Sequence, residues 1–234
     1  MGREILGHLG TVEALRRQRR GEASLEARVL AVKAFQHQRF ALTYADLMAE
    51  PVYAPAARFF LDDLYGPGDF TQRDAQFARI VPALIRLFPP EMVATVATLA
   101  ELHALSEQLD DELARHVVEG PLLMPAYRAA WQRTASPARR LEQIELMMQV
   151  GRALERFTRN PVLRGSLRVM RVPAKLAGLS ALQSFLERGF DTFGQMPDPE
   201  SFLGTIVARE QKIANWLFSG EPVVPAHCGL ENIG

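Results

Sequence analysis

The chain has 234 residues, of which 48% are hydrophobic and 23% are charged. This composition is that of a globular protein and excludes an extended disordered chain, and the length suits one domain with a substantial core. The 27 basic residues balance 27 acidic residues. The chain therefore has no overall field that would attract nucleic acid, and we expect no nucleic-acid partner.

The number of cysteines and the length of the apolar runs indicate the cellular compartment of the protein. Cys228 is the only cysteine, so no disulfide can form within the chain. No stretch approaches ~18 uninterrupted apolar residues, and the N-terminus has no apolar run of signal-peptide length. These features predict a cytoplasmic protein without a membrane span. They assign no role to Cys228.

The N-terminal residues are polar and basic, with the run RRQRR at 16–20. We expect residues 1–23 to form a loose arm or a frayed helix, with this run solvated. From residue 25 to residue 50 there is no glycine or proline, which predicts one helix of about seven turns. Pro51 ends it.

The segment 54–90 contains two expected helices joined by the Gly-Pro-Gly turn at 66–68. Asp69 is placed to cap the second helix, and Gln72 three residues later completes a capping-box pattern. Pro82 falls inside the apolar stripe of the second helix. We expect it to kink or split that helix.

Start and stop residues mark the remaining helices. They are expected over 91–118, around Tyr127, from Pro137 to Asn160, from Pro173 to Phe193 and from Pro199 to Gly220. No run shows sustained strand alternation. The sequence therefore predicts an all-α, single-domain bundle of seven to nine helices over residues 24–219, followed by an extended tail over 220–234.

Charged residues lie among aromatic ones in the segment 58–79. One interpretation is structural, with acids and arginines forming an internal ion-pair lattice around a fixed turn, and we favour it because an unpaired buried charge costs ~3–5 kcal/mol. The other interpretation is a pocket for an acidic head group. The residues in question are Arg58, Asp62, Asp63, Tyr65, Arg73 and Arg79.

A second candidate site is a metal centre. His103, Glu107 and Asp110 stand at positions i, i+4 and i+7, on one face of the expected helix over 91–118. His37 could approach them from the first long helix. A hydrogen-bonded histidine is the favoured alternative, and we predict no cofactor.

No catalytic constellation is present, since the sequence has no nucleophile elbow, phosphate loop or dinucleotide fingerprint. We favour a non-enzymatic helical protein that self-associates or docks a protein partner. The alternative is a small-molecule binding domain in which phenylalanines hold an apolar tail beneath an acidic head. A metal- or haem-dependent helical protein is the second alternative.

Several blocks resemble an uncharacterised family of bacterial all-helical proteins. They are FFLDDLYG at 59–66, RDAQFARIVPALIRLFP at 73–89, LSEQLD at 105–110, MRVPAKLAGL at 170–179, LQSFLERGF at 182–190 and ARE at 208–210. The resemblance covers about residues 25–218. It implies that these blocks belong to one domain, and it brings no activity, cofactor or catalytic residue with it.

Overall fold

The computed structural model describes residues 1–64, 70–134 and 137–221, except for the side chains of Leu64 and Leu87. Within these residues it contains twelve α-helices, one π-helical turn and no strand. The elements are α1 (Gly2–Arg20), α2 (Ala23–Thr43), α3 (Ala45–Ala49), α4 (Ala54–Phe59), the π-helical turn η1 (Phe60–Leu64), α5 (Thr71–Leu87), α6 (Pro90–Ala114), α7 (Met124–Arg133), α8 (Pro137–Thr158), α9 (Pro161–Val169), α10 (Arg171–Leu176), α11 (Ser180–Gly194) and α12 (Pro199–Phe218). The all-α class is confirmed, whereas the expected count of seven to nine helices is wrong.

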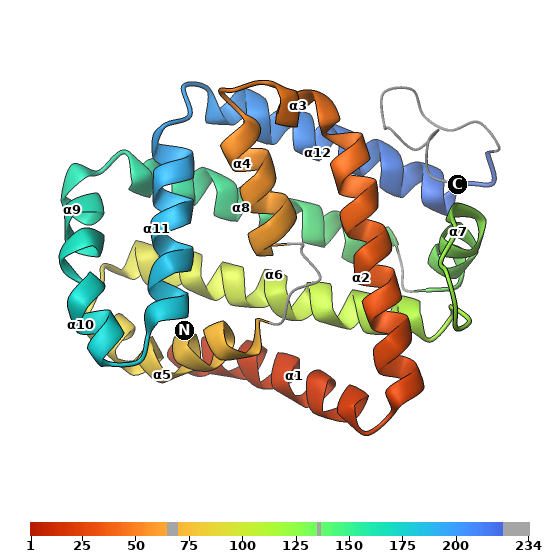
Figure 1. The fold of residues 1–234 in the computed structure, drawn as a ribbon, viewed down its shortest axis with the longest axis horizontal. Coiled ribbons are helices and arrows are strands. Elements are labelled where there is room, and N and C mark those ends of the chain that lie inside the picture. Colours follow the sequence, from red (N-terminus) through yellow and green to blue (C-terminus); the bar gives the residue numbers. More distant parts are fainter. Residues whose placement is uncertain (65–69, 135–136, 222–234) are drawn as a thin grey trace.

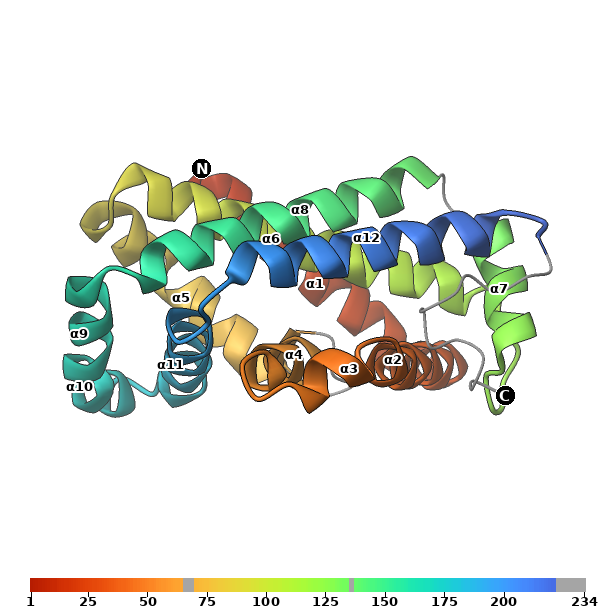
Figure 2. The same cartoon turned by 90° about the horizontal axis from the view of Figure 1, so that it is seen from above.

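The helices form two crossed layers. Helices α6, α8 and α12 run side by side, and α2, α4 and α11 cross one face of that layer (Figures 1 and 2). Helices α1 and α5 pack along α6, while α7 lies at one end of the molecule and α9 and α10 at the other (Figure 1).

Buried apolar side chains form two main clusters. The larger one joins the crossing helices to α7, α8 and α12, and the smaller one joins α1, α5 and the first half of α6. The smaller cluster includes Ile5, Leu9, Val81, Leu84 and Ala100. The space between the two clusters holds the cavity described below.

The N-terminal residues do not form a loose arm. Ile5, Leu9 and Val12 are buried, and with Arg16 and Arg19 they recur every three or four residues, so α1 presents one continuous face to α6. Arg19 is itself buried, with 5% of its surface exposed. Part of the run RRQRR therefore belongs to the interior.

Two of the expected helices are divided, one at a buried tyrosine and the other at a glycine. The helix expected over 25–50 is interrupted at Tyr44, whose side chain is fully buried and whose hydroxyl donates to a carboxylate oxygen of Glu210 at 2.7 Å. The helix expected from Pro173 ends instead near Gly178. That residue has a φ of +69°, a left-handed conformation in which glycine is favoured.

Other boundaries follow the sequence closely. The carboxylate of Asp198 accepts a hydrogen bond from the backbone of Ser201 and begins α12, as an acid followed by proline predicts. Helix α5 runs on through Pro82 rather than splitting there. Burial of the neighbouring Val81 and Leu84 offsets the backbone hydrogen bond that the proline removes.

Some expected features lie outside the described residues. They are the Gly-Pro-Gly turn at 66–68, the caps at Asp69 and Ser136, and most of the tail, from residue 222 onward, which includes Cys228.

We expect Gly151→Ala to destabilise the protein by about 1–3 kcal/mol, because α8 and α12 pack closely at this glycine. A Cβ there would lie 2.6 Å from a terminal methyl group of Leu203, which is fully buried. Gly204→Ala is the matched control, since no atom lies within 4 Å of its added Cβ. It should stabilise α12 by up to ~1 kcal/mol. Urea unfolding of both variants measures the difference, and equal effects would contradict close packing at Gly151.

Candidate functional site

A cavity of about 300 Å³ lies between α5, α6, α9 and α11, with further lining from α1, α2 and α8. It borders both apolar clusters, since Leu84 and Ala100 belong to the smaller one and Met147 to the larger one. Its volume is at the lower end of the range found for small-molecule sites, which is about 300–1,000 Å³.

The cavity lining changes character along α6. Met92, Val96 and Leu99 line it in the first half of this helix, whereas His103, Glu107 and Asp110 line it in the second. At 1.5 Å per residue these positions extend over roughly 27 Å of helix. The cavity is therefore elongated, with an apolar end and a charged end.

Helix α5 repeats this division in the opposite chain direction. Its first turn supplies Arg73 and Asp74, and its later turns supply Phe77, Ile80 and Leu84. Only Phe88 and Pro89 separate the end of α5 at Leu87 from the start of α6 at Pro90, and Phe88 also lines the cavity. The apolar parts of both helices thus meet at this turn.

Helices α9 and α11 complete the apolar end. Leu163 and Leu167 line it from α9, and Phe185, Leu186 and Phe190 line it from α11. Leu163 and Leu167 are four residues apart, as are Leu186 and Phe190, so one face of each helix is turned to the cavity.

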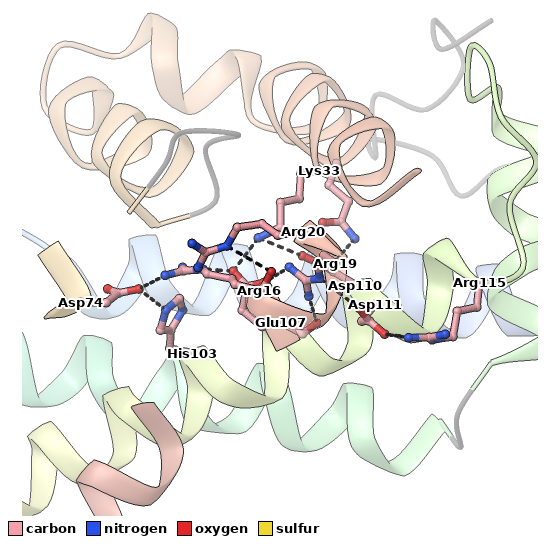
Figure 3. Close-up of polar contacts among 11 residues, drawn as sticks. Arg16, Arg19, Arg20, Lys33, Asp74, His103, Glu107, Asp110, Asp111 and Arg115 are labelled. Atoms are coloured by element: carbon pink, nitrogen blue, oxygen red, sulfur yellow. Dashed lines mark hydrogen bonds and ion pairs between the residues drawn. The ribbon is translucent and has the colours of Figure 1, made fainter. Parts of the chain in front are cut away.

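The charged end adjoins a buried ion-pair network centred on Glu107 (Figure 3). Glu107 is 3% exposed and accepts from a guanidinium nitrogen of Arg19 at 2.6 Å and from the ammonium of Lys33 at 2.7 Å. A nitrogen of Arg16 lies 3.5 Å away. Helices α1, α2 and α6 are joined at this point.

Two further acids of α6 extend the network. Asp111 accepts from Nε of Arg19 at 2.9 Å, while Asp110 lies 3.7 Å from the ammonium of Lys33 and accepts from the amide of Gln36 at 3.1 Å. Asp110 and Asp111 are both buried. The basic residues of α1 and α2 therefore neutralise acids of α6 by direct contact.

Asp74 connects α5 to the same network. Its carboxylate lies 2.8 Å from a nitrogen of Arg16 and 2.9 Å from Nε2 of His103, and Nε of Arg73 lies 3.4 Å away (Figure 3 shows the contacts with Arg16 and His103). Asp74 thus has three basic neighbours from three helices.

Burial and charge shift the pKa values of these acids in different directions. Burial alone would raise the pKa of Glu107, but the charges and hydrogen bonds of Lys33 and Arg19 lower it to about 2. Burial raises the pKa of Asp110, and Lys33 opposes this only in part. Burial also acts to raise the pKa of Asp74, but hydrogen bonding to His103 and the nearby positive charges outweigh it, so that pKa lies below its usual value.

Arg73 is the basic residue of α5 at the cavity wall. Its guanidinium lies over the rings of Phe70 and Phe185, at 4.2 and 4.7 Å from their centroids. One nitrogen donates to the backbone carbonyl of Asp63 at 2.8 Å. Burial lowers the pKa of Arg73, and Asp74 compensates for this only in part. The site therefore holds a partly buried cation whose paired acid is Asp74, with its Nε 3.4 Å from the carboxylate.

The residues that the sequence grouped over 58–79 do not form one site. Arg58 and Asp62 are exposed, and Asp63 pairs with Arg188 of α11 rather than with Arg73 or Arg79. Arg79 is also exposed and donates to the backbone carbonyl of Ala177. Of the described members only Arg73 lines the cavity, and Tyr65 lies outside the described residues. The ion-pair lattice expected in this segment is found only in part, because Arg73 pairs with Asp74 but Arg79 pairs with no acid in the described part of the chain.

His103, Glu107 and Asp110 do share one face of α6, as their spacing predicts. Each has a protein partner: Asp74 for His103, Arg19 and Lys33 for Glu107, and Gln36 for Asp110. Among the described residues, no three histidine, cysteine, aspartate or glutamate side chains form a group that could hold a metal ion.

Sequence reasoning missed Arg16, Arg19 and Lys33. The available signal was the spacing 5, 9, 12, 16, 19, which continues the apolar face of α1 into the two arginines. Lys33 carries no comparable signal. Its role depends on how α2 crosses α6, which no local pattern specifies.

These features define a class of protein: an all-helical single domain with an internal cavity that is charged at one end and apolar at the other. The chain belongs to the family "Domain of unknown function (DUF8198)", whose model matches residues 15–224. The resemblance to an uncharacterised family is thereby confirmed, while its bacterial origin and the signature status of the quoted blocks stay predictions. No curated protein and no solved structure matches the chain.

No helix among the described residues is long and apolar enough to cross a membrane. Self-association, docking of a protein partner and a cytoplasmic location stay predictions.

Proposed function

We propose that this protein binds a small amphipathic molecule in the cavity, with the apolar part between α5, α9 and α11 and an acidic head at Arg73. The observation that supports this most directly is the change from apolar to charged lining along α6. A purely apolar cavity would suit a hydrocarbon, and a purely charged one would suit a small ion. A cavity that is apolar at one end and charged at the other suits an amphipathic molecule.

The charge at Arg73 favours an acidic head. Its Nη2 atom has no hydrogen-bond partner within the described part of the chain, although Nη1 and Nε have partners. This nitrogen can donate to an anion, and a charge-assisted hydrogen bond of that kind contributes about 1.5–3 kcal/mol. Lys33 and His103 also line this end of the cavity.

The test uses 11-(dansylamino)undecanoic acid as a fluorescent probe, followed by displacement with dodecanoate or with dodecanol. We expect saturable binding of the probe and at least ~10-fold stronger displacement by dodecanoate, which is the effect of one charge-assisted hydrogen bond. Arg73→Met should remove this preference. Arg79→Met is the matched control on the same helix, since Arg79 is exposed and does not line the cavity.

A blocking variant tests the position of the apolar part. Leu186→Trp fills the apolar end and should weaken probe binding at least ~10-fold, since it removes volume that the chain would occupy. Leu141→Trp is its control, because Leu141 is 45% exposed on α8. Absence of saturable binding by the wild type would refute the proposal, as would equal effects of the two tryptophan substitutions.

A further inference from the structure

Helices α9 and α10, which lie at one end of the molecule (Figure 1), carry five exposed large apolar side chains. Val162, Val169, Val172 and Leu176 are 72%, 76%, 67% and 85% exposed, and Met170 is 49% exposed. Val162 and Val169 stand seven residues apart on α9, two helical turns from one another, and Leu176 is the last residue of α10. These five residues are the apolar surface of α9–α10.

Basic residues accompany this apolar surface. The chain from 159 to 186 contains five basic residues and no aspartate or glutamate: Arg159, Arg164, Arg168, Arg171 and Lys175. Arg168 and Lys175 are exposed and have no ion-pair partner in the described part of the chain. The other three are paired, Arg159 with Glu155, Arg164 with Asp191 and Arg171 with Glu187. An exposed apolar face that carries unpaired cations is the pattern of a helix that lies in a membrane interface.

We propose that α9 and α10 dock this protein onto an anionic lipid surface, with the apolar side chains at the acyl boundary and the cations at the head groups. Charge separates this partner from a second copy of the chain. A symmetric dimer through this face would bring two copies of Arg168 and Lys175 together, and neither residue has an ion-pair partner in the described part of the chain. An anionic lipid surface supplies the opposite charge at every position.

The cavity lies directly behind this surface. Leu163 and Leu167 line it from α9, and Met170 both lines it and is half exposed. In the docked protein, α9 alone would therefore separate the lipid from the cavity. Uptake of an amphipathic molecule from the membrane follows from this placement and rests on the proposed function, whereas docking itself does not.

Co-sedimentation of the full chain with vesicles tests the docking. We expect binding to vesicles of equimolar phosphatidylcholine and phosphatidylglycerol, little binding to phosphatidylcholine alone, and a decrease as salt rises. Each basic residue near an anionic surface contributes about five-fold in affinity, so Arg168→Glu/Lys175→Glu should lower binding at least about ten-fold. Arg3→Glu/Arg133→Glu, two exposed arginines elsewhere, should change it far less.

The apolar contribution is tested by Val169→Ser/Leu176→Ser, which should lower binding to anionic vesicles at least about ten-fold, since two buried aliphatic side chains are lost from the interface. The matched control is Val118→Ser/Leu123→Ser, at 80% and 51% exposure in the connection between α6 and α7. Helix α7 lies at the opposite end of the molecule from α9 and α10 (Figure 1). Equal losses in both pairs would overturn the proposal.

Two further outcomes would also overturn it. One is absence of binding to either kind of vesicle. The other is a dimer in sedimentation velocity that Val169→Ser/Leu176→Ser abolishes, which would assign this face to a second copy. Leu186→Trp separates this proposal from the proposed function, because it should weaken probe binding in the cavity at least ~10-fold and leave vesicle binding unchanged.

Discussion

Glu107→Gln is expected to lower the free energy of unfolding by about 3–5 kcal/mol, the usual effect of removing one partner from a buried ion pair. Glutamine has nearly the shape of glutamate but no charge. Arg19, which is 5% exposed, would keep Asp111 as a partner but lose the carboxylate at 2.6 Å. Lys33 would lose its nearest acid, at 2.7 Å, and retain only Asp110 at 3.7 Å.

Glu200→Gln is the matched control. Glu200 pairs with Arg152 at 3.0 Å, but both side chains are 55% exposed, so the pair should contribute only about 0–1 kcal/mol. Urea unfolding at neutral pH measures both variants. A change below ~1 kcal/mol for Glu107→Gln would show that the network stabilises the fold little, since breaking a buried pair ordinarily costs several times more.

The same residue predicts a pH dependence. The folded-state pKa of Glu107 is about 2, below its ordinary value of 4.5. Its stabilisation is therefore fully present above pH ~4.5 and is lost as the pH falls from 4.5 toward 2, by an amount on the order of 3 kcal/mol. Glu107→Gln should flatten the stability curve in this window.

Asp110 acts in the opposite sense. Its pKa is raised by burial, so the folded state is penalised while Asp110 is ionised, and the penalty disappears as the pH falls through the raised value. Protonation of Asp110 therefore offsets part of the stability that protonation of Glu107 removes, at the upper end of the range from pH 4.5 to 2. Asp110→Asn should stabilise the protein at neutral pH relative to Glu107→Gln, and the two stability curves should converge at low pH.

Phe60→Ala is expected to destabilise the protein by about 3–5 kcal/mol, because it removes a large buried side chain and leaves a cavity. Phe60 is 2% exposed in the π-helical turn η1. Its ring lies 6.1 Å from that of Phe193 on α11 and 5.8 Å from that of Phe202 on α12, measured between centroids. One side chain thus connects three elements of the larger apolar cluster.

Phe88→Ala provides the comparison, since Phe88 is 43% exposed and should cost less than ~1 kcal/mol. Phe60→Leu should recover most of the lost stability. Phe60 does not line the cavity, so the folded fraction of Phe60→Ala should bind the dansyl probe with unchanged affinity. A marginal effect of Phe60→Ala on unfolding would mean that η1 is not a structural junction.

The candidate site could be predicted only in part. The sequence places His103, Glu107 and Asp110 on one face, because that depends on helical spacing alone, and it singles out Arg73 as a candidate. It wrongly joins Arg73 to Arg58 and Arg79, which lie near it along the chain but not in the site. Proximity in sequence was a poor guide here because Arg58 lies on another helix, α4, and Arg79 lies six residues after Arg73 on α5, which places it on a different face at 3.6 residues per turn.

The sequence by itself determines the helical class and many helix ends, such as the start of α12 at Asp198, because caps, prolines and apolar spacing act within a few residues. Only the tertiary structure decides which charges meet. Glu107 lies 88 residues from Arg19 and 74 from Lys33, and the pairing of these groups depends on how α1, α2 and α6 cross. Desolvation and Coulomb energy act through space, and so does the side-chain packing that leaves a cavity. No local sequence pattern therefore predicts the ion-pair network or the cavity.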